Sequence, residues 1–597
     1  MVFFGAIALI LCCFLLGHLW RPLSPLPLGT AVWGYLVKSL LLSWIWFLLS
    51  YYTPIGAFAP WLVLALLAAV ALHQWRSTAI EIQKTSFATD TYHITAGIFA
   101  FSLLAVPGLM SLGSTFVHWD AVVSWNRWAI ELSNNLYAPA PSAYPVLWPA
   151  IWSLIYEAQS NRDIWYFAQA SMVIPAVLGG LFLAGKCLTR QQPMAHLVLA
   201  FLVMTIFFFQ SQFAFTGYMD VHACLIGIIG VLLLAEASTQ EQPKLRMEYL
   251  LLAGISLGLA MLTKQTAAVF GLIFGLYTLV EFARRRISFT QGVILACVLI
   301  LPTLTFWGIY LEKQPSLFGN LSELTRHTEN ARGADEVASH ALNVLTDAVP
   351  GYILPLLCLG TLLNIFWPLR PQSLIGITCA LAAIPYFYAY AECCSYNVRN
   401  GLLVYALLTV SCFTGFQNLE KFSSEFFQRH PAPANFTHFL NKTSLGWAVL
   451  IMAALVFFAI PQKKFVDTHD SLLEESLGHK KVAWFLEPHK QTIQRTDKVI
   501  SYFQPLAFMP YITPERYEIC KVTTIKCLND VFAEPATRHV VVFTAGWNES
   551  QSVRDFWTQQ IKIGRAELLR QLHPNSFRLF RVTRDNWEKT AADSKAS

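Results

Sequence analysis

The feature that most constrains this chain is a series of separate apolar runs, each about 18 to 22 residues long. A helix of that length crosses the hydrocarbon core of a bilayer with its backbone hydrogen bonds satisfied internally. The 597 residues are 55% hydrophobic and only 13% charged, whereas soluble globular chains carry about 25% charged residues. We therefore predict a polytopic α-helical membrane protein with about fourteen transmembrane helices. The predicted spans are 2–18, 36–53, 57–74, 95–113, 163–184, 195–212, 220–237, 248–265, 266–283, 291–310, 349–368, 372–391, 400–417 and 444–461.

The basic residues predict how these spans are oriented. Cytoplasmic loops of membrane proteins carry an excess of lysine and arginine. With the N-terminus outside, the cytoplasmic connections hold Arg21, Lys38, Arg76, Lys84, Lys186, Arg190, Lys244, Arg246, Arg284, Arg285, Arg286, Arg370, Lys421, Arg429 and Lys442. The opposite topology would put the three consecutive arginines at 284–286 outside, so we reject it.

This orientation places several loops on one non-cytoplasmic side. They are the segment 114–162, the turn at 216–220, the turn at 262–265, the loop 311–348 and the stretch 392–400. We expect a bacterial inner membrane with these loops facing the periplasm, and the endoplasmic reticulum is the alternative.

Residues 462–597 form a polar tail on the same side, with the composition of an ordinary globular domain. The runs "KVISYF", "HVVVFTAGW" and "FRLFRV" are typical of strands, and 550–571 is typical of a helix. We predict a small C-terminal α/β extracytoplasmic domain, in which Cys520 and Cys527 are candidates for a disulfide in an oxidising compartment.

Four ionisable residues lie at outer helix ends, where the bilayer makes charges costly and functional candidates by default. Asp120 lies in the tryptophan-rich segment "HWDAVVSWNRWAIEL", whose spacing suits an amphipathic helix along the interface. Asp220 ends the turn "GYMD", Lys264 follows "GLAML", and Arg399 lies in "SYNVRNGLL".

Each of the four has a plain structural alternative. Asp120 would be incidental in an aromatic belt that anchors the segment at the membrane surface. Asp220 would cap the N-terminus of the following helix. Lys264 would extend its ammonium group toward water, and Arg399 would pair with Glu392 or a lipid headgroup.

Taken together, two carboxylates and two cations from distant stretches are predicted to face one compartment. Such a set suits a site that handles a lipid-linked phosphate, because cations stabilise a leaving phosphate and a carboxylate can orient or deprotonate an incoming hydroxyl or amine. An arginine such as Arg399 also suits bidentate capture of a phosphate. Asp120, Asp220 and His222 could together hold a divalent cation, although their spacing does not require one.

At these residues the sequence resembles the GT-C superfamily of membrane glycosyltransferases, in the branch with the protein O-mannosyltransferases and the lipid A aminoarabinose transferase. The resemblance rests on "HWDA" around Asp120 in the first large outer loop, on the "GYMD" turn ending at Asp220, and on "GLAMLTKQ", which is similar to the branch's "GLAxLTKG". An arginine near a later outer helix start, Arg399, and an outer domain after the last span fit as well. The resemblance covers roughly 95–461, and the tail matches in position only.

The resemblance implies a polyprenyl-phosphate-sugar donor, with Asp120 as the catalytic base and Lys264 and Arg399 in contact with the donor phosphate. Asp220 would be a supporting polar residue. We assign further supporting or substrate-binding roles to His118, Trp119, Tyr144 and Tyr396.

The resemblance also predicts how the chain is divided. Residues 1–93 would be three added N-terminal transmembrane helices, and 94–461 would be a GT-C-like catalytic core that carries the interfacial outer loop 114–162. Residues 462–597 would be the soluble extracytoplasmic domain.

The expected partners are the polyprenyl-phosphate-linked donor, a glycan, lipid or protein acceptor, and membrane lipids. The modest net charge of +6 gives no indication of nucleic-acid binding. Three other classes stay open. One is a polysaccharide polymerase or ligase, which Arg326, His327 and Arg332 in loop 311–348 would favour. The others are a transporter or flippase of lipid-linked sugars and a non-catalytic scaffold, which would tolerate charge removal at all four positions.

Overall fold

The computed structural model forms two units. One comprises Met1–Ser114 and Ala129–Asp470, and the other Thr115–Trp128 and Ser471–Ser597. The structure describes residues 26–52, 65, 69–70, 72, 91–112, 114–116, 121–134, 145–159, 161–162, 165–189, 192–208, 214–313, 334–368, 370–394, 398–429, 485–501, 517–519, 525–545, 551–572 and 577–588.

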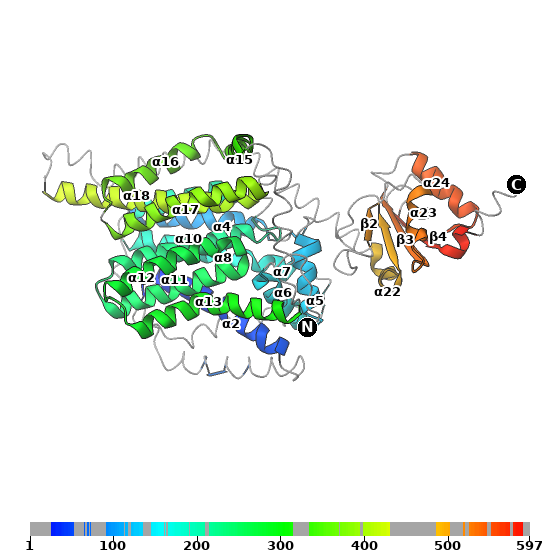
Figure 1. The fold of residues 1–597 in the computed structure, drawn as a ribbon, viewed down its shortest axis with the longest axis horizontal. Coiled ribbons are helices and arrows are strands. Elements are labelled where there is room, and N and C mark those ends of the chain that lie inside the picture. Colours follow the sequence, from blue (N-terminus) through cyan, green and yellow to red (C-terminus); the bar gives the residue numbers. More distant parts are fainter. Residues whose placement is uncertain are drawn as a thin grey trace. The chain divides into compact units, whose positions relative to one another are not determined.

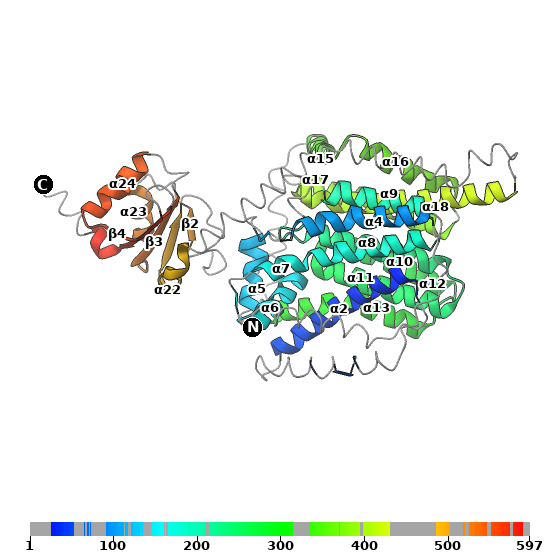
Figure 2. The ribbon, with the colours of Figure 1, turned by 180° about the vertical axis from the view of Figure 1, so that it is seen from behind.

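The first unit is a bundle of long apolar helices, several of which run side by side in both views (Figures 1 and 2). Its main helices are α2 (Leu28–Tyr52), α4 (Thr91–Met110), α6 (Leu147–Gln159), α8 (Val173–Leu188), α9 (Pro193–Val203), α10 (Asp220–Thr239), α11 (Pro243–Thr263), α12 (Ala268–Ala283), α13 (Phe289–Lys313), α15 (Ala334–Ala348), α16 (Ile353–Leu363), α17 (Pro371–Cys394) and α18 (Leu402–Arg429). Within the described residues, nine helices are long and apolar enough to cross a membrane, and two apolar helices are shorter.

These eleven helices coincide with the predicted spans that fall in the described part of the chain. The predicted spans 2–18 and 444–461, and most of 57–74, lie outside it. The membrane-protein class is therefore confirmed, while the total of fourteen spans stays a prediction. The division at 93 and 461 also stays a prediction.

Several basic residues predicted in cytoplasmic connections lie inside helices instead: Lys38 in α2, Lys186 in α8, Lys244 and Arg246 in α11, and Lys421 and Arg429 in α18. Lys38 was expected in a cytoplasmic connection, but α2 begins at Leu28 and contains it. The Lys38 ammonium lies 3.6 Å from the carboxylate of Glu248 in α11, and both side chains are buried. A lysine can lie inside this helix because a partner on another helix compensates its charge.

Burial separates central helices from peripheral ones. In α10 94% of the apolar window is buried inside the protein, whereas in α13 only 22% is. The outward side chains of α12 and α13, such as Leu272 and Phe289, are large and apolar, as expected for helices that face lipid. The α10–α11 pair therefore lies in the interior of the bundle, with a short connection at 240–242 that makes the two helices antiparallel.

The second unit contains a five-stranded mixed sheet in the order β2-β1-β3-β5-β4. The strands are β1 (Lys498–Ser501), β2 (Tyr517–Ile519), β3 (His539–Ala545), β4 (Ala566–Leu572) and β5 (Phe577–Thr583). β1 pairs in parallel with β2 and β3, and β5 pairs antiparallel with β3 and β4. The α/β class and the three predicted strands are confirmed.

Helices α23 (Ile525–Ala533) and α24 (Gln551–Lys562) supply the core of this sheet, where Leu528 and Trp557 pack with Val542 and Phe580. The helix predicted over 550–571 is only half right, because α24 ends at Lys562 and β4 follows. The break has a local cause: Gly564 has a φ of 77°, a left-handed conformation that favours glycine at a helix end.

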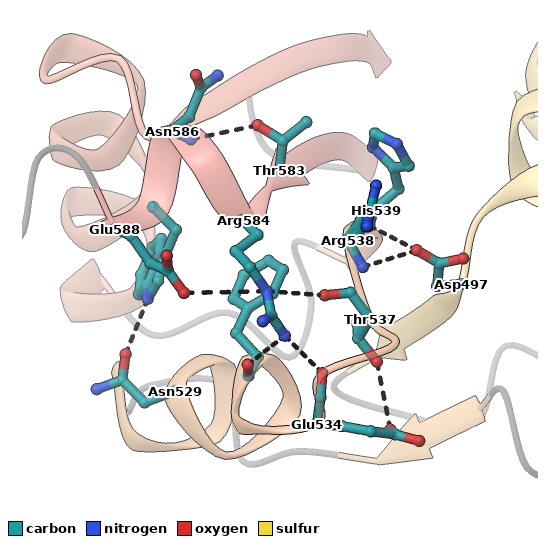
Figure 3. Close-up of polar contacts among 12 residues, drawn as sticks. Asp497, Asn529, Glu534, Thr537, Arg538, His539, Thr583, Arg584, Asn586 and Glu588 are labelled. Carbon is teal, nitrogen blue, oxygen red and sulfur yellow. Dashed lines mark hydrogen bonds and ion pairs between the residues drawn. The ribbon is translucent and has the colours of Figure 1, made fainter.

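Polar contacts join Arg584, the residue after the last strand of the second unit, to the end of α23 (Figure 3). The guanidinium of Arg584 donates hydrogen bonds to the backbone carbonyls of Phe532, Glu534 and Thr537. The carboxylate of Asp497 accepts hydrogen bonds from the backbone N–H groups of Arg538 and His539, both at 2.8 Å (Figure 3). Cys527 forms a disulfide, and its predicted partner Cys520 lies outside the described residues.

Candidate active site

The start of α10 and the end of α11 bring a carboxylate and an ammonium group together. The Lys264 Nζ lies 3.1 Å from the Asp220 Oδ1, and the two side chains are 9% and 6% exposed. Antiparallel packing of α10 and α11 makes this contact possible, because Asp220 opens one helix and Lys264 follows the other. Each of these buried charges is stabilised by the other, and the loss of either one would leave an uncompensated charge away from water.

The backbone around Lys264 explains why the lysine points inward. α11 ends at Thr263, and Lys264 is extended, with φ −151° and ψ 130°. The short 3₁₀ segment η5 (Gln265–Ala267) then leads into α12. The alternative of a lysine that extends toward water is wrong, because its ammonium group is buried in an ion pair.

Asp220 does not act as the expected helix cap. The cap position of α10 is Met219, and no side-chain hydrogen bond caps the helix. The carboxylate is used in the ion pair through Oδ1, while its buried Oδ2 accepts no hydrogen bond among the described residues. Gly217, with a φ of 102°, forms the turn that directs the chain into α10.

Arg399 reaches the same end of α10. It lies in η8 (Val398–Gly401), a 3₁₀ segment that contacts α10. The Arg399 Cζ lies 4.5 Å from the centroid of the Tyr218 ring, a cation–π contact. Tyr218 precedes Asp220 by two residues, so the structure brings Asp220, Lys264 and Arg399 to one end of the bundle.

His222 lies on the first turn of α10, and its side chain is buried in contacts within the bundle. Its Nε2 is 2.8 Å from the backbone carbonyl oxygen of Met172. The imidazole packs edge-on against Trp148, with ring centroids 5.2 Å apart. In the part of the chain that the structure describes, no three His, Cys, Asp or Glu side chains form a group that could hold a metal ion. The predicted cation site includes Asp120, outside that part, and stays a prediction.

The other predicted site residues cannot be placed against this geometry. His118, Trp119, Asp120, Tyr144 and Tyr396 lie outside the described residues. So do Arg326, His327 and Arg332, which carried the polymerase alternative.

The segment after Asp120 is helical, as the spacing predicts. A π-helical stretch, Ala121–Asn126, continues into α5 (Arg127–Leu132). The rings of Trp125 and Trp128 meet edge-on, with centroids 4.9 Å apart.

Sequence reasoning missed two tyrosines that line this end of the bundle. Tyr218 belongs to the "GYMD" motif, so the motif itself could have marked it as a site residue. In the structure it contacts Arg399. Tyr386 of α17 donates a hydrogen bond from its hydroxyl to the Asn400 carbonyl, at 3.0 Å. Nothing in the sequence around Tyr386 distinguishes it from the neighbouring tyrosines of the same helix.

Comparisons with known proteins add a likeness of fold. No protein-family model matches the chain, and no curated protein matches it. Among solved structures, it is similar to ArnT from Cupriavidus metallidurans, whose crystal structure has undecaprenyl phosphate bound. The two share 12% sequence identity with a TM-score of 0.47, over 84% of this chain and 99% of that one. A likeness at this level does not define a family for the chain.

Proposed function

We propose that this protein is a membrane glycosyltransferase that moves a sugar from a polyprenyl-phosphate carrier to a lipid, glycan or protein acceptor. The reaction would take place on the extracytoplasmic side, in a bacterial inner membrane. The main support for the proposal is the ion pair of Lys264 with Asp220 at 3.1 Å. Arg399, which lies over the Tyr218 ring, is at the same end of α10.

The two cations suit a departing phosphate. Lys264 is held by Asp220 in a buried position, and a fixed charge in such a place stabilises a developing negative charge more strongly than a solvated one does. Arg399, stacked on Tyr218, offers a planar pair of donors for two phosphate oxygens. Each well-aimed donor of this kind is commonly worth about 3 kcal/mol of transition-state stabilisation.

The proposed reaction is a direct displacement at the anomeric carbon. Asp120 accepts the proton of the acceptor hydroxyl as its oxygen bonds to that carbon. The bond from the carbon to the phosphate oxygen breaks, and the polyprenyl phosphate leaves as an anion beside Lys264 and Arg399. Asp220 keeps Lys264 in place, and its Oδ2, which accepts no hydrogen bond among the described residues, offers an acceptor to a substrate hydroxyl.

The test is in vitro transfer from a synthetic polyprenyl-phosphate sugar, with release of polyprenyl phosphate as the readout. We expect turnover by the wild type and a loss of at least a hundredfold in Asp120→Asn. Asp530→Asn removes an exposed carboxylate and is the matched control. Equal turnover by wild type and Asp120→Asn would remove the mechanism. Movement of the intact lipid-linked sugar from one leaflet of a vesicle membrane to the other, without cleavage, would identify a transporter instead.

A further inference from the structure

Tyr386 is bonded to the short segment that carries Arg399 and lies near the one that follows Lys264. Its hydroxyl donates a hydrogen bond to the backbone carbonyl of Asn400 in η8, at 3.0 Å. The Tyr386 side chain also lies near that of Thr266 in η5. Asn400 directly follows Arg399, and Thr266 lies two residues after Lys264, so one hydroxyl lies between both cation-bearing turns.

The hydroxyl of a tyrosine can donate only one hydrogen bond, which restricts how its partners can be arranged. A tyrosine hydroxyl has one proton to donate, which goes to the Asn400 carbonyl, and its oxygen can accept the hydroxyl proton of Thr266. Tyr386 is also close enough to Asp220 for an electrostatic interaction. The same side chain therefore bonds directly to η8 and lies near both η5 and the carboxylate that holds Lys264.

The turns themselves give little rigidity. η5 spans Gln265–Ala267 and η8 spans Val398–Gly401, each about one turn of 3₁₀ helix. Such short segments keep their orientation through contacts with neighbouring elements. α17, a helix of 24 residues, supplies that contact through Tyr386.

We propose that Tyr386 is a positioning residue that sets the spacing of Lys264 and Arg399 for a lipid-linked phosphate. This inference rests on the proposed function, in which those two cations bind the phosphate. Tyr386 acts through the two turns, by fixing η8 and η5 against α17.

The first experiment measures the dissociation constant of a synthetic polyprenyl phosphate for the purified full-length protein in detergent. Tyr386→Phe removes only the hydroxyl, and we expect binding to weaken about five- to tenfold. Tyr388→Phe makes the same change at an exposed position two residues further along α17. It should bind as the wild type does.

A second set of variants separates positioning from a general loss of structure. We expect Tyr386→Phe to weaken binding much less when Arg399→Gln or Lys264→Gln is already present, because interacting residues are not additive. Full additivity in both backgrounds would overturn the inference. Thr266→Val keeps the tyrosine and removes the hydroxyl that lies near it in η5, so it should weaken binding even if Tyr386→Phe proves too unstable to purify.

The outcomes distinguish the inference from the function on which it rests. Wild-type affinity in Lys264→Gln and in Arg399→Gln would overturn both. Weak binding in those variants, with wild-type affinity in Tyr386→Phe and in Thr266→Val, would overturn only the role of Tyr386.

Discussion

The ammonium of Lys264 lies 3.1 Å from a carboxylate oxygen of Asp220, and both groups are almost fully removed from solvent. The partners belong to the facing ends of α10 and α11, so the pair depends on how these helices pack. Burial of two charges costs several kcal/mol for each ion, and their attraction offsets that cost only while both are present. The pair therefore contributes little net stability, but the loss of either partner is damaging.

Removing the charge of Lys264 should destabilise the protein. Lys264→Gln leaves the Asp220 carboxylate buried without its partner, and we expect about 3 kcal/mol less stability. The double variant Lys264→Gln/Asp220→Asn has no unpaired charge and should recover most of that loss, yet it should bind polyprenyl phosphate more weakly than the wild type does. Thermal unfolding in detergent measures the first effect and ligand binding the second. A double variant as unstable as the single one would show that the pair is not electrostatically coupled.

A second buried pair at the opposite end of α10 should affect stability alone. The Lys186 ammonium lies 3.2 Å from the Glu236 carboxylate and near the Tyr249 ring. Glu236 follows Asp220 by about 24 Å along the helix axis. We expect Lys186→Met to lower stability by about 3 kcal/mol, because Glu236 loses its partner.

Below its unfolding temperature, Lys186→Met should still bind polyprenyl phosphate with the wild-type affinity, in contrast to Lys264→Gln. The comparison of the two variants uses the same thermal unfolding and binding assays. If folded Lys186→Met lost the ligand, the two ends of α10 would be coupled, as in a transport path.

The helices were predictable because a bilayer demands long apolar runs, a requirement that each run meets by itself. The start of α2 could not be predicted in this way, because Lys38 lies inside the helix and the residue that compensates its charge is Glu248, on a helix far along the chain. In the same way, the end of α24 depends on the single residue Gly564, which the pattern of apolar residues around it does not show.

For the candidate site, the sequence indicated which side of the membrane Asp220, Lys264 and Arg399 would face. The ion pair and the stacking of Arg399 on Tyr218 depend on the packing of α10 against α11 and η8. Tyr386 was missed because the role proposed for it depends on a hydrogen bond to Asn400 and on its position near Thr266, both of which are set by how α17 packs against the two turns. Contacts of that kind leave no local pattern in a single sequence.

Glu157 should make stability depend on pH. It lies in α6, outside the candidate membrane spans, and burial raises the pKa of its carboxyl from 4.5 to about 7, although Arg162 opposes the shift. Since the folded-state pKa is raised, the folded protein keeps a proton that the unfolded chain loses. This carboxyl therefore lowers stability as the pH rises from 4.5 through about 7.

We expect Glu157→Gln to abolish that part of the pH dependence and to be more stable than the wild type at pH 8. Thermal unfolding at pH 5 and pH 8 measures the difference. The control is Glu241→Gln, which changes an exposed glutamate in the connection between α10 and α11. A wild-type pH profile in Glu157→Gln would mean that this carboxyl titrates normally.

Arg584 should be a main support of the C-terminal unit. Its guanidinium donates to the Phe532, Glu534 and Thr537 carbonyls, and so it satisfies carbonyl groups at and just beyond the end of α23 (Figure 3). Arg584→Ala leaves those oxygens without this donor and should cost about 2 kcal/mol or more, because hydrogen bonds from a charged group are strong. Arg581→Ala, three residues earlier on β5, is the matched control.

The control removes a single ion pair between Arg581 and Glu567, whose side chains are 45% and 55% exposed, respectively. Its loss should lower stability by less than about 1 kcal/mol. Pulse proteolysis of the full-length protein in urea, with mass spectrometry of the cleavage sites in 462–597, compares the two variants. The Arg584 variant should be cut at the lower urea concentration, because the end of α23 separates from the last strand when its carbonyls lose their shared donor. Equal urea midpoints for the two variants would instead show that the backbone pairing of β5 with β3 and β4 holds this end of the unit.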